Sequence, residues 1–170
     1  MGGIAGVNYA TISNCKFKGS IKADTAYSAT RLGGIVAQSE YFYSDKTPKI
    51  ESCGSEGSMT LLYDDTRSFA YIGGILGYVE SNCTLNKNFF IGTISNPSEG
   101  QLLLVGGICG LWNGYNTLQN NAFINNNETL HGLYYFYSYF YGYQYADDIE
   151  GLIKGYSSID SIKALEIYWE

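Results

Sequence analysis

The chain has 170 residues, of which 45% are hydrophobic and only 15% are charged. This apolar fraction excludes bulk disorder, and the length allows one domain or one piece of a repeat array. The net charge is −6 and the Lys and Arg residues are scattered, which excludes a basic face for nucleic acid or for anionic membranes. No apolar run approaches the roughly 20 residues that span a bilayer, so we expect no membrane insertion by this segment. The 21 Gly and 17 Tyr residues favour a β-rich protein.

A Gly-Gly-Ile triplet recurs along the chain. The copies are Gly2–Ile4, Gly33–Ile35, Gly73–Ile75 and Gly106–Ile108. Each copy follows an apolar residue and precedes two apolar or small residues. Glycine at a fixed position suits a corner that needs positive φ or a close approach to another coil, whereas a Gly pair inside a strand makes room for a bulky neighbour. The sequence leaves these interpretations open.

A second block follows each triplet and has the same internal spacing in every copy. The blocks start at Ile12, Ile50, Leu85 and Leu118. Similar residue types recur three, five, seven and nine positions after each start, although the last copy loses the pattern at its end. The steps of two are the period of a β-strand. The residues three positions after each start are Cys15, Cys53, Asn88 and Asn121.

The two-part repeat predicts that successive copies stack. A short strand with one apolar stripe cannot bury it alone, but in register on its copy, about 4.8 Å away, it joins a parallel sheet with a continuous core. We therefore expect the four block starts to form one apolar ladder. A second ladder is expected from Ile4, Ile35, Ile75 and Ile108. Asn88 and Asn121 can hydrogen-bond along the stack, and Cys15 and Cys53 come within disulfide reach, although stacked free thiols are the favoured interpretation.

These motifs resemble the GLUG repeat, whose pattern is Gly-Gly-apolar-apolar-Gly, a spacer, and Ile-Ser-Asn-Cys before an alternating strand. Gly2–Gly6 with Ile12–Cys15 is the best copy; Gly73–Gly77 and Gly106–Gly110 keep the Gly core, and Gly33–Ala37 departs at its last position. The resemblance covers about residues 1–127. It implies a parallel β-solenoid segment of a large secreted or cell-surface bacterial protein, as in adhesin-like proteins and the non-catalytic parts of some immunoglobulin A proteases. It implies no catalytic residues.

The sequence therefore predicts an all-β fold, a parallel β-solenoid (β-helix-like) of about four repeats with a Tyr-rich C-terminal cap that contains a short helix. The expected repeat region is 1–130, and the expected cap is 131–170. The repeats are expected at about 1–31, 32–71, 72–104 and 105–130.

The predicted cap begins with a Tyr-rich stretch. Every odd-numbered position from 135 to 145 is Tyr. In a β-strand these positions share one face, so we expect one or two strands with a Tyr stripe and a bend at Gly142. Next, Ser158–Leu165 is predicted to be a short helix capped by Ser157 or Ser158 and lying across the last coil, because its apolar residues recur on one face. Ile167–Trp169 is predicted to be a last strand.

The candidate ligand-binding residues are tyrosines, which offer rigid area and a hydroxyl suited to a glycan or a host or matrix protein. They are Tyr135, Tyr137, Tyr139, Tyr141 and Tyr143, with Tyr41 and Tyr43 in a second cluster. The alternative is structural, because the last coil of a solenoid exposes apolar core and unpaired strand edges that need a cover. We favour the structural role for the stripe.

No catalytic constellation stands out. The pairs Asp64-Asp65 and Asp147-Asp148 are typical of solvated turns, because neighbouring strand residues point to opposite faces. His131 is the single histidine, and the Cys spacing fits no zinc site. We therefore expect no catalytic residue, no metal and no cofactor.

The function predicted from the sequence is that of a non-enzymatic structural or adhesive module, extracellular or on a bacterial cell surface and part of a longer chain. The alternatives are a carbohydrate-active β-helix enzyme, of polysaccharide lyase or hydrolase type, and a pure spacer. An enzyme should gather three or more carboxylate or basic groups in one groove. An adhesin should instead show a smooth sheet and exposed aromatic residues.

Overall fold

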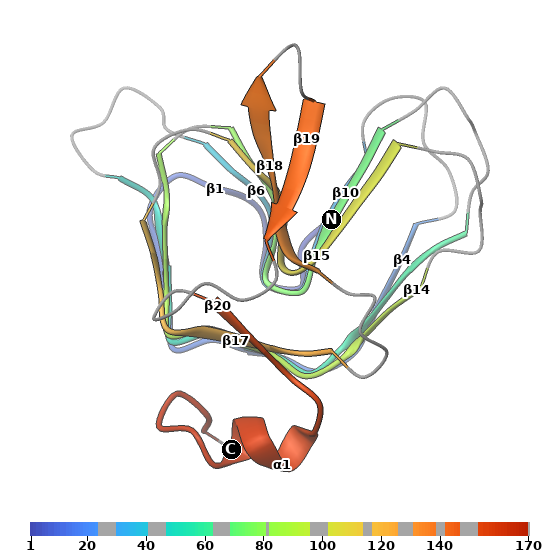
Figure 1. The fold of residues 1–170 in the computed structure, drawn as a ribbon. Helices are drawn as coiled ribbons and strands as arrows, with labels where there is room; N and C mark the ends of the chain where they lie inside the picture. The colour runs from blue at the N-terminus through green and yellow to red at the C-terminus, as the bar shows by residue number, and fades with distance from the viewer. Residues whose placement is uncertain are drawn as a thin grey trace.

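The computed structural model describes residues 1–23, 30–40, 47–62, 69–80, 82–95, 102–113, 117–125, 131–138, 142–146 and 153–169. In these residues the chain is almost entirely β-structure and winds repeatedly around one core, with each turn lying on the one before (Figure 1). Strands from successive repeats pair in parallel, so the fold is all-β with parallel sheets.

Three of the sheets form the walls of the stack, each built from short strands of successive coils. The first wall contains β2 (Thr11–Ser13), β7 (Lys49–Glu51), β12 (Thr84–Asn86) and β16 (Thr117–Gln119). The second contains β3 (Lys16–Phe17), β8 (Gly54–Ser55), β13 (Phe89–Phe90), β17 (Asn121–Ile124) and β20 (Ile153–Tyr156). The third contains β4 (Ser20–Ala23), β9 (Ser58–Leu61) and β14 (Thr93–Ser95). We call the second the base sheet.

The fourth sheet bends inward between the first and third walls. One arm contains β1 (Ala5–Asn8), β6 (Val36–Ser39) and β11 (Leu76–Val79). The other contains β5 (Thr30–Gly33) and β10 (Phe69–Gly73). The strand β15 (Leu102–Trp112) runs through both arms and links them. The Gly-Gly-Ile triplets lie where the arms meet, so the bend points into the core (Figure 1).

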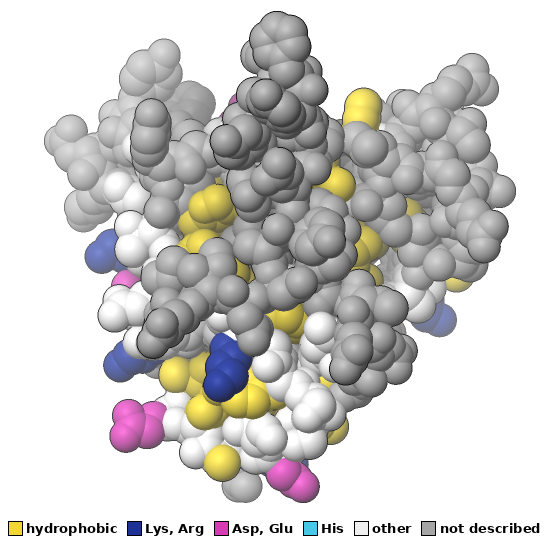
Figure 2. Space-filling view, in the orientation of Figure 1, with side chains coloured by type: hydrophobic (Ala, Val, Ile, Leu, Met, Phe, Trp, Pro, Cys, Tyr) yellow, Lys and Arg dark blue, Asp and Glu magenta, His cyan; other side chains and the backbone are white. Residues whose placement is uncertain are grey.

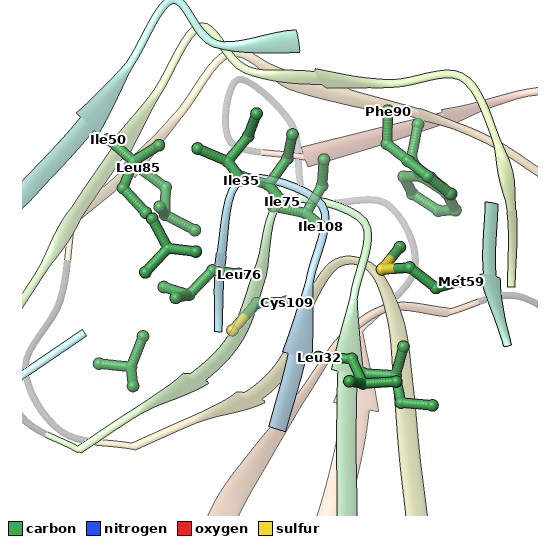
Figure 3. Packing of buried hydrophobic residues seen from close by; sticks show 14 of the residues in the cluster. Leu32, Ile35, Ile50, Met59, Ile75, Leu76, Leu85, Phe90, Ile108 and Cys109 are labelled. Carbon is green, nitrogen blue, oxygen red and sulfur yellow. The ribbon is translucent and has the colours of Figure 1, made fainter. Parts of the chain in front are cut away.

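The register confirms both apolar ladders. Ile12 pairs with Ile50, Ile50 with Leu85, and Leu85 with Leu118. In the second ladder the backbone N–H groups of Ile4, Ile35 and Ile75 each donate to the carbonyl of the next rung. Figure 3 shows Ile35, Ile75 and Ile108 side by side, facing Ile50 and Leu85 across the core. The repeat spacing therefore predicted the register of the stack.

The glycine pairs form corners by close approach, and none of these glycines has positive φ. A Cβ on Gly33 would lie 1.7 Å from the carbonyl oxygen of Val36, because the chain folds back on itself there. A Cβ on Gly74 would lie 2.0 Å from the Gly107 carbonyl oxygen and 2.3 Å from the Phe90 ring. The first glycine thus permits the turn, and the second makes room for the base sheet and the next coil.

Positive φ occurs at another corner, between the first wall and the base sheet. The residues there are Asn14, Ser52, Lys87 and Asn120, with φ between 52° and 55°. Each stands two positions after a block start, so the corner recurs in all four coils. None is glycine, so of the alternatives left open for the glycine pairs the structure shows close approach at a corner and not positive φ. Asn suits this left-handed conformation, but Ser and Lys adopt it at a cost.

The next position along the chain carries the Cys-Cys-Asn-Asn row. Asn88 is fully buried; its side-chain amide donates to the Asn121 Oδ1 at 3.0 Å and to the Ile50 carbonyl at 2.9 Å. Its own Oδ1 accepts from the Cys53 N–H at 3.0 Å. The predicted hydrogen bonding along the stack is confirmed, and Cys15 and Cys53 are free thiols. Burial raises the pKa of Cys53 to about 11, which keeps this thiol protonated at neutral pH.

The C-terminal residues add two strands to the stack and one hairpin. The strand β18 (His131–Ser138) pairs in parallel with β15, and β20 pairs in parallel with β17. The strand β19 (Gly142–Ala146) runs back antiparallel to β18. Up to Phe136 the register pairs odd positions of one strand with even positions of the other, as in Tyr135 with Gln144 and Phe136 with Tyr143; beyond a register shift, Ser138 pairs with Gly142. Where odd positions pair with even ones, the predicted single Tyr stripe is divided between two rows.

The helix α1 (Ile159–Lys163) follows, and Ser158 is its N-cap as predicted. It ends earlier than predicted, and Ile159 is 43% exposed rather than packed. The helix lies against the last coil, as predicted, and does so from outside: it packs on the outer face of the base sheet, below β17 and β20 (Figure 1). Ile167–Trp169 forms no strand, so that prediction is wrong. These residues instead lie against the outer side chains of the base sheet.

Candidate functional site: the groove beside the C-terminal segment

The predicted tyrosines cannot be assembled into a site from the described residues. Tyr135 and Tyr137 lie on β18 and Tyr143 on β19, and their side chains are outside the described part of the structure. Four further predicted residues, Tyr41, Tyr43, Tyr139 and Tyr141, lie outside the described residues altogether, as do Asp64, Asp65, Asp147 and Asp148.

The outer face of the base sheet instead carries two rows of side chains. Strand alternation points Phe90 into the main core and Phe89 outward, where it packs with residues of the C-terminal segment. Register places Lys16, Gly54, Phe89, Ala122 and Lys154 in one outer row. The second outer row, two positions farther along each strand, contains Lys18, Glu56, Ile91, Ile124 and Tyr156. The outer face is therefore charged at the first two coils and apolar on β13 and β17, and it carries the exposed Lys154 again on β20.

Residues 157–169, which we call the C-terminal segment, cover the apolar part of this face. Ile162 is fully buried and packs with Phe89, Ala122 and Ile124. The segment is locked locally, because the Ser158 side-chain oxygen accepts from the Ser161 N–H at 3.3 Å. Partly buried residues of the segment join the same cluster: Leu165, Ile167, Tyr168 and Trp169. A second, smaller core thus fixes the segment to the outside of the base sheet.

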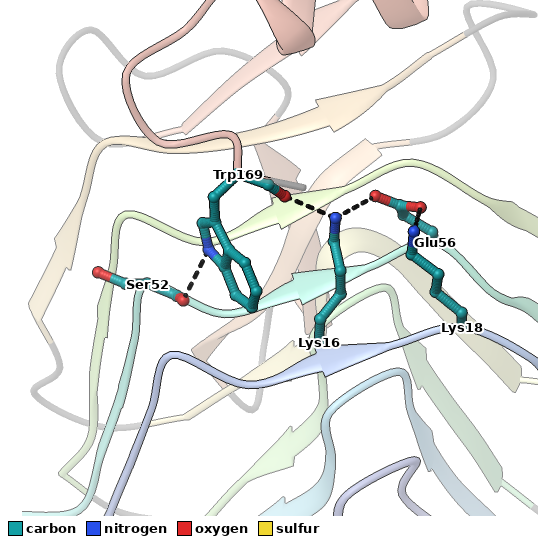
Figure 4. Close-up of polar contacts among 5 residues, drawn as sticks. All are labelled: Lys16, Lys18, Ser52, Glu56 and Trp169. Carbon is teal, nitrogen blue, oxygen red and sulfur yellow. Dashed lines mark hydrogen bonds and ion pairs between the residues drawn. The ribbon is translucent and has the colours of Figure 1, made fainter.

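The end of the segment reaches the charged part of the face and holds Lys16 there. Lys16 Nζ donates to the Trp169 carbonyl oxygen at 2.6 Å and forms an ion pair with Glu56 at 2.7 Å (Figure 4). The ammonium also lies 4.8 Å from the ring centroid of Tyr168, 5.2 Å from that of Trp169 and 5.5 Å from that of Phe89. Three aromatic rings, a carbonyl and a carboxylate therefore surround one cation.

Two further contacts complete this arrangement. The indole N–H of Trp169 donates to the Ser52 carbonyl at 3.2 Å, which ties the segment to the second coil. Glu56 also forms an ion pair with Lys18 at 3.2 Å (Figure 4). Burial would raise the pKa of the Glu56 carboxyl, but hydrogen bonds from Lys16 and Lys18 outweigh it and hold that pKa below its ordinary value. Glu56 is therefore ionised at neutral pH.

A groove of about 520 Å³ lies between the base sheet and the C-terminal segment. Among the described residues its lining consists of Lys18, Glu56, Ile91, Ile159, Lys163 and Tyr168. The side chain of Lys18 is 62% exposed, and Lys163 Nζ lies 6.0 Å from the Tyr168 ring centroid. The groove joins two cations, a carboxylate and apolar surface, and its volume is within the range of about 300–1,000 Å³ typical of ligand sites.

Sequence analysis missed this groove. In a strand, Lys16 and Lys18 point to the face opposite that of Phe17, so the sequence indicates two outward lysines on either side of an inward aromatic ring. It carries no sign that Lys163 and Tyr168, almost 150 positions later, come to lie beside them.

Comparison with known families supports the repeat. A sequence model described as the GLUG motif matches residues 1–22, which contain the first glycine pair and extend into β4. The chain carries a GLUG motif. The match covers the first coil. Among the described residues, the strands of the first wall and of the base sheet recur in register in the next three coils, and the third-wall strand recurs in the next two. Comparisons with curated proteins and with solved structures gave no match.

The match with the GLUG motif ends at residue 22 and assigns no role to the groove. Within the described ranges, no three His, Cys, Asp or Glu side chains are placed to hold a metal ion. No helix of the described chain is long and apolar enough to cross a membrane.

Proposed function

We propose that this chain is a β-solenoid module of a secreted or cell-surface bacterial protein and that it binds a glycan or a host or matrix protein without catalysing a reaction. The observation that carries the proposal is the in-register stacking of successive coils, the first of which matches the GLUG motif, because such a stack is a rigid scaffold that supports loops and outer side chains at fixed spacing. The groove beside the C-terminal segment and the tyrosines of β18 and β19 are its candidate contact surfaces.

An enzyme is the second candidate, because the groove brings three charged side chains together. Glycoside hydrolysis generally uses two carboxyl groups, one of them as acid. In the described lining Glu56 is the one carboxylate, and ion pairs with Lys16 and Lys18 hold it ionised. A general acid needs the opposite, a raised pKa. The described groove therefore favours binding over hydrolysis.

A glycan and host-protein array probed with the purified chain tests the proposal. We expect binding of at least one glycan or extracellular protein, with no release of sugar from polysaccharides. Alanine at Tyr135 and Tyr137 reports on the hairpin, and Tyr9→Ala, at an exposed residue of the first coil, is the matched control. Absence of any binding would favour a spacer, and release of products would favour the enzyme.

A further inference from the structure

We propose that the groove beside the C-terminal segment binds a sugar ring that carries a carboxylate, such as a uronic acid. This inference rests on the proposed function, since it names the glycan class and the residues that recognise it. Lys18 and Lys163 would bind the carboxylate, and Tyr168 with Ile91 and Ile159 would contact the ring.

The charges in the groove leave two cations available for a ligand. Glu56 has a dedicated partner in Lys16, whose side chain is only 10% exposed and which approaches to 2.7 Å. Lys18 is therefore not required to neutralise Glu56, although the 3.2 Å contact holds its ammonium at the groove. Because the charge of Lys16 neutralises that of Glu56, the positive charges of Lys18 and Lys163 remain in the described lining. An anionic ligand is thus favoured on a chain whose net charge is −6.

The apolar side chains of the lining indicate that the ligand also has an apolar surface. Ile159 is 43% exposed, although the other apolar side chain on α1, Ile162, is buried. Tyr168 is half-buried, with its ring next to Lys163 Nζ. A pyranose presents an apolar C–H face that packs on such surface while its carboxylate reaches the lysines. A bare inorganic anion would leave the aromatic and aliphatic side chains without a contact, and a neutral sugar would offer no negative charge to the two ammonium groups.

The direct test is titration of the full chain with sodium glucuronate, glucose and sodium acetate, followed by NMR or calorimetry at low ionic strength. We expect glucuronate to bind at least about tenfold more tightly than glucose or acetate, because charge-assisted hydrogen bonds and ring contacts must act together. Binding should weaken as salt is added, since the lysines are partly exposed.

Variants locate the site. Lys163→Gln and Lys18→Gln are each expected to weaken glucuronate binding about tenfold or more. Lys22→Gln, on the exposed face of β4, should leave it unchanged. A thermal unfolding curve for each variant confirms that the fold is intact. Ile159→Ser removes ring contact at an exposed position and should weaken glucuronate without affecting acetate.

The outcomes separate this inference from the proposed function. Equal affinity for glucuronate and glucose, equal affinity for glucuronate and acetate, or full binding by the Lys163→Gln variant would each overturn the groove assignment. If the array shows a neutral glycan or a protein bound while glucuronate fails, the adhesive function stands and only the groove assignment falls.

Discussion

At the residue scale, equivalent positions in the coils share one backbone conformation even where their amino acids differ. The corner after the first wall has the same positive φ in four coils, yet Asn, Ser and Lys occupy it. The second glycine of each pair faces an aromatic ring in three coils, whereas Gly34 faces Ser55. Backbone geometry is common to all coils because stacked strands must follow the same path. The residue type at an equivalent position can vary as long as its side chain fits the available space.

The corner residue Lys87 provides a test, because its φ of 55° is unfavourable for an exposed lysine. Lys87→Gly should raise the free energy of unfolding by up to about 1 kcal/mol, since glycine adopts this conformation without strain. Urea denaturation measures the change. The control, Lys49→Gly on β7, should lose stability because glycine weakens a strand. Loss of stability in both variants would contradict the account of the corner.

Ser55 provides a second test at this scale. Its side chain is fully buried, and its hydroxyl has no hydrogen-bond partner among the described residues. Ser55→Ala should therefore stabilise the protein by about 1 kcal/mol, as seen by chemical denaturation. Ser39→Ala is the control and should be destabilising, because the Ser39 hydroxyl reaches the Asn8 carbonyl at 3.5 Å. A destabilised Ser55→Ala variant would show that the hydroxyl is satisfied.

At the scale of elements, the C-terminal segment is attached to the outside of the stack by its own small core and by one cation. Its apolar residues cover the outer face at the later coils, and Lys16 holds its end at the first coil. The segment therefore spans successive coils along the stack. It also forms one side of the groove, so its attachment controls the shape of the candidate site.

Lys16→Met tests this attachment, because methionine keeps the aliphatic contacts and removes the charge. We expect amide exchange in residues 157–169 to accelerate by at least about tenfold, since hydrogen bonds to charged groups contribute about 1.5–3 kcal/mol. Exchange in the first-wall strands should not change. The matched control is Lys22→Met on β4, which should leave the segment protected. Equal protection in both variants would show that the apolar contacts alone hold the segment.

At the scale of the whole molecule, stability comes from contacts between neighbouring coils, and in the described residues the first coil contacts one neighbouring coil. The exposed large hydrophobic residues include Met1, Ile4, Val7 and Tyr9, all in that coil. Their equivalents in the interior are covered by the next rung: Ile35 and Ile75 are fully buried where Ile4 is 46% exposed. The same residue type therefore contributes differently to the free energy of unfolding in different coils of the stack.

Two substitutions on one ladder measure this difference. Ile75→Ala should reduce the free energy of unfolding by about 3 kcal/mol, because it leaves a cavity between two covered rungs. Ile4→Ala should cost less than about 1 kcal/mol, because the side chain is half in solvent already. Urea denaturation of both variants provides the comparison. Equal losses would contradict the stacking account.

The stack could be predicted from the repeat spacing alone. The spacing of the triplets and blocks predicted which residues lie over one another, and the ladders at Ile12 and Ile35 have that register. This was possible because parallel stacking places equivalent positions at equal height, so sequence period becomes spatial neighbourhood. The N-cap at Ser158, one of the two predicted serines, could also be predicted from the sequence, because capping involves only neighbouring residues.

The tertiary structure alone decided where the C-terminal segment lies and how the groove forms. Helical periodicity identifies an apolar face on α1 but not the surface that covers it, which the fold supplies from Phe89, Ala122 and Ile124 of the base sheet. Lys16 meets Trp169 across 153 positions, and no repeat relates them. The division of the Tyr positions between two rows likewise depends on the register of β18 with β19, which the alternation of Tyr does not determine.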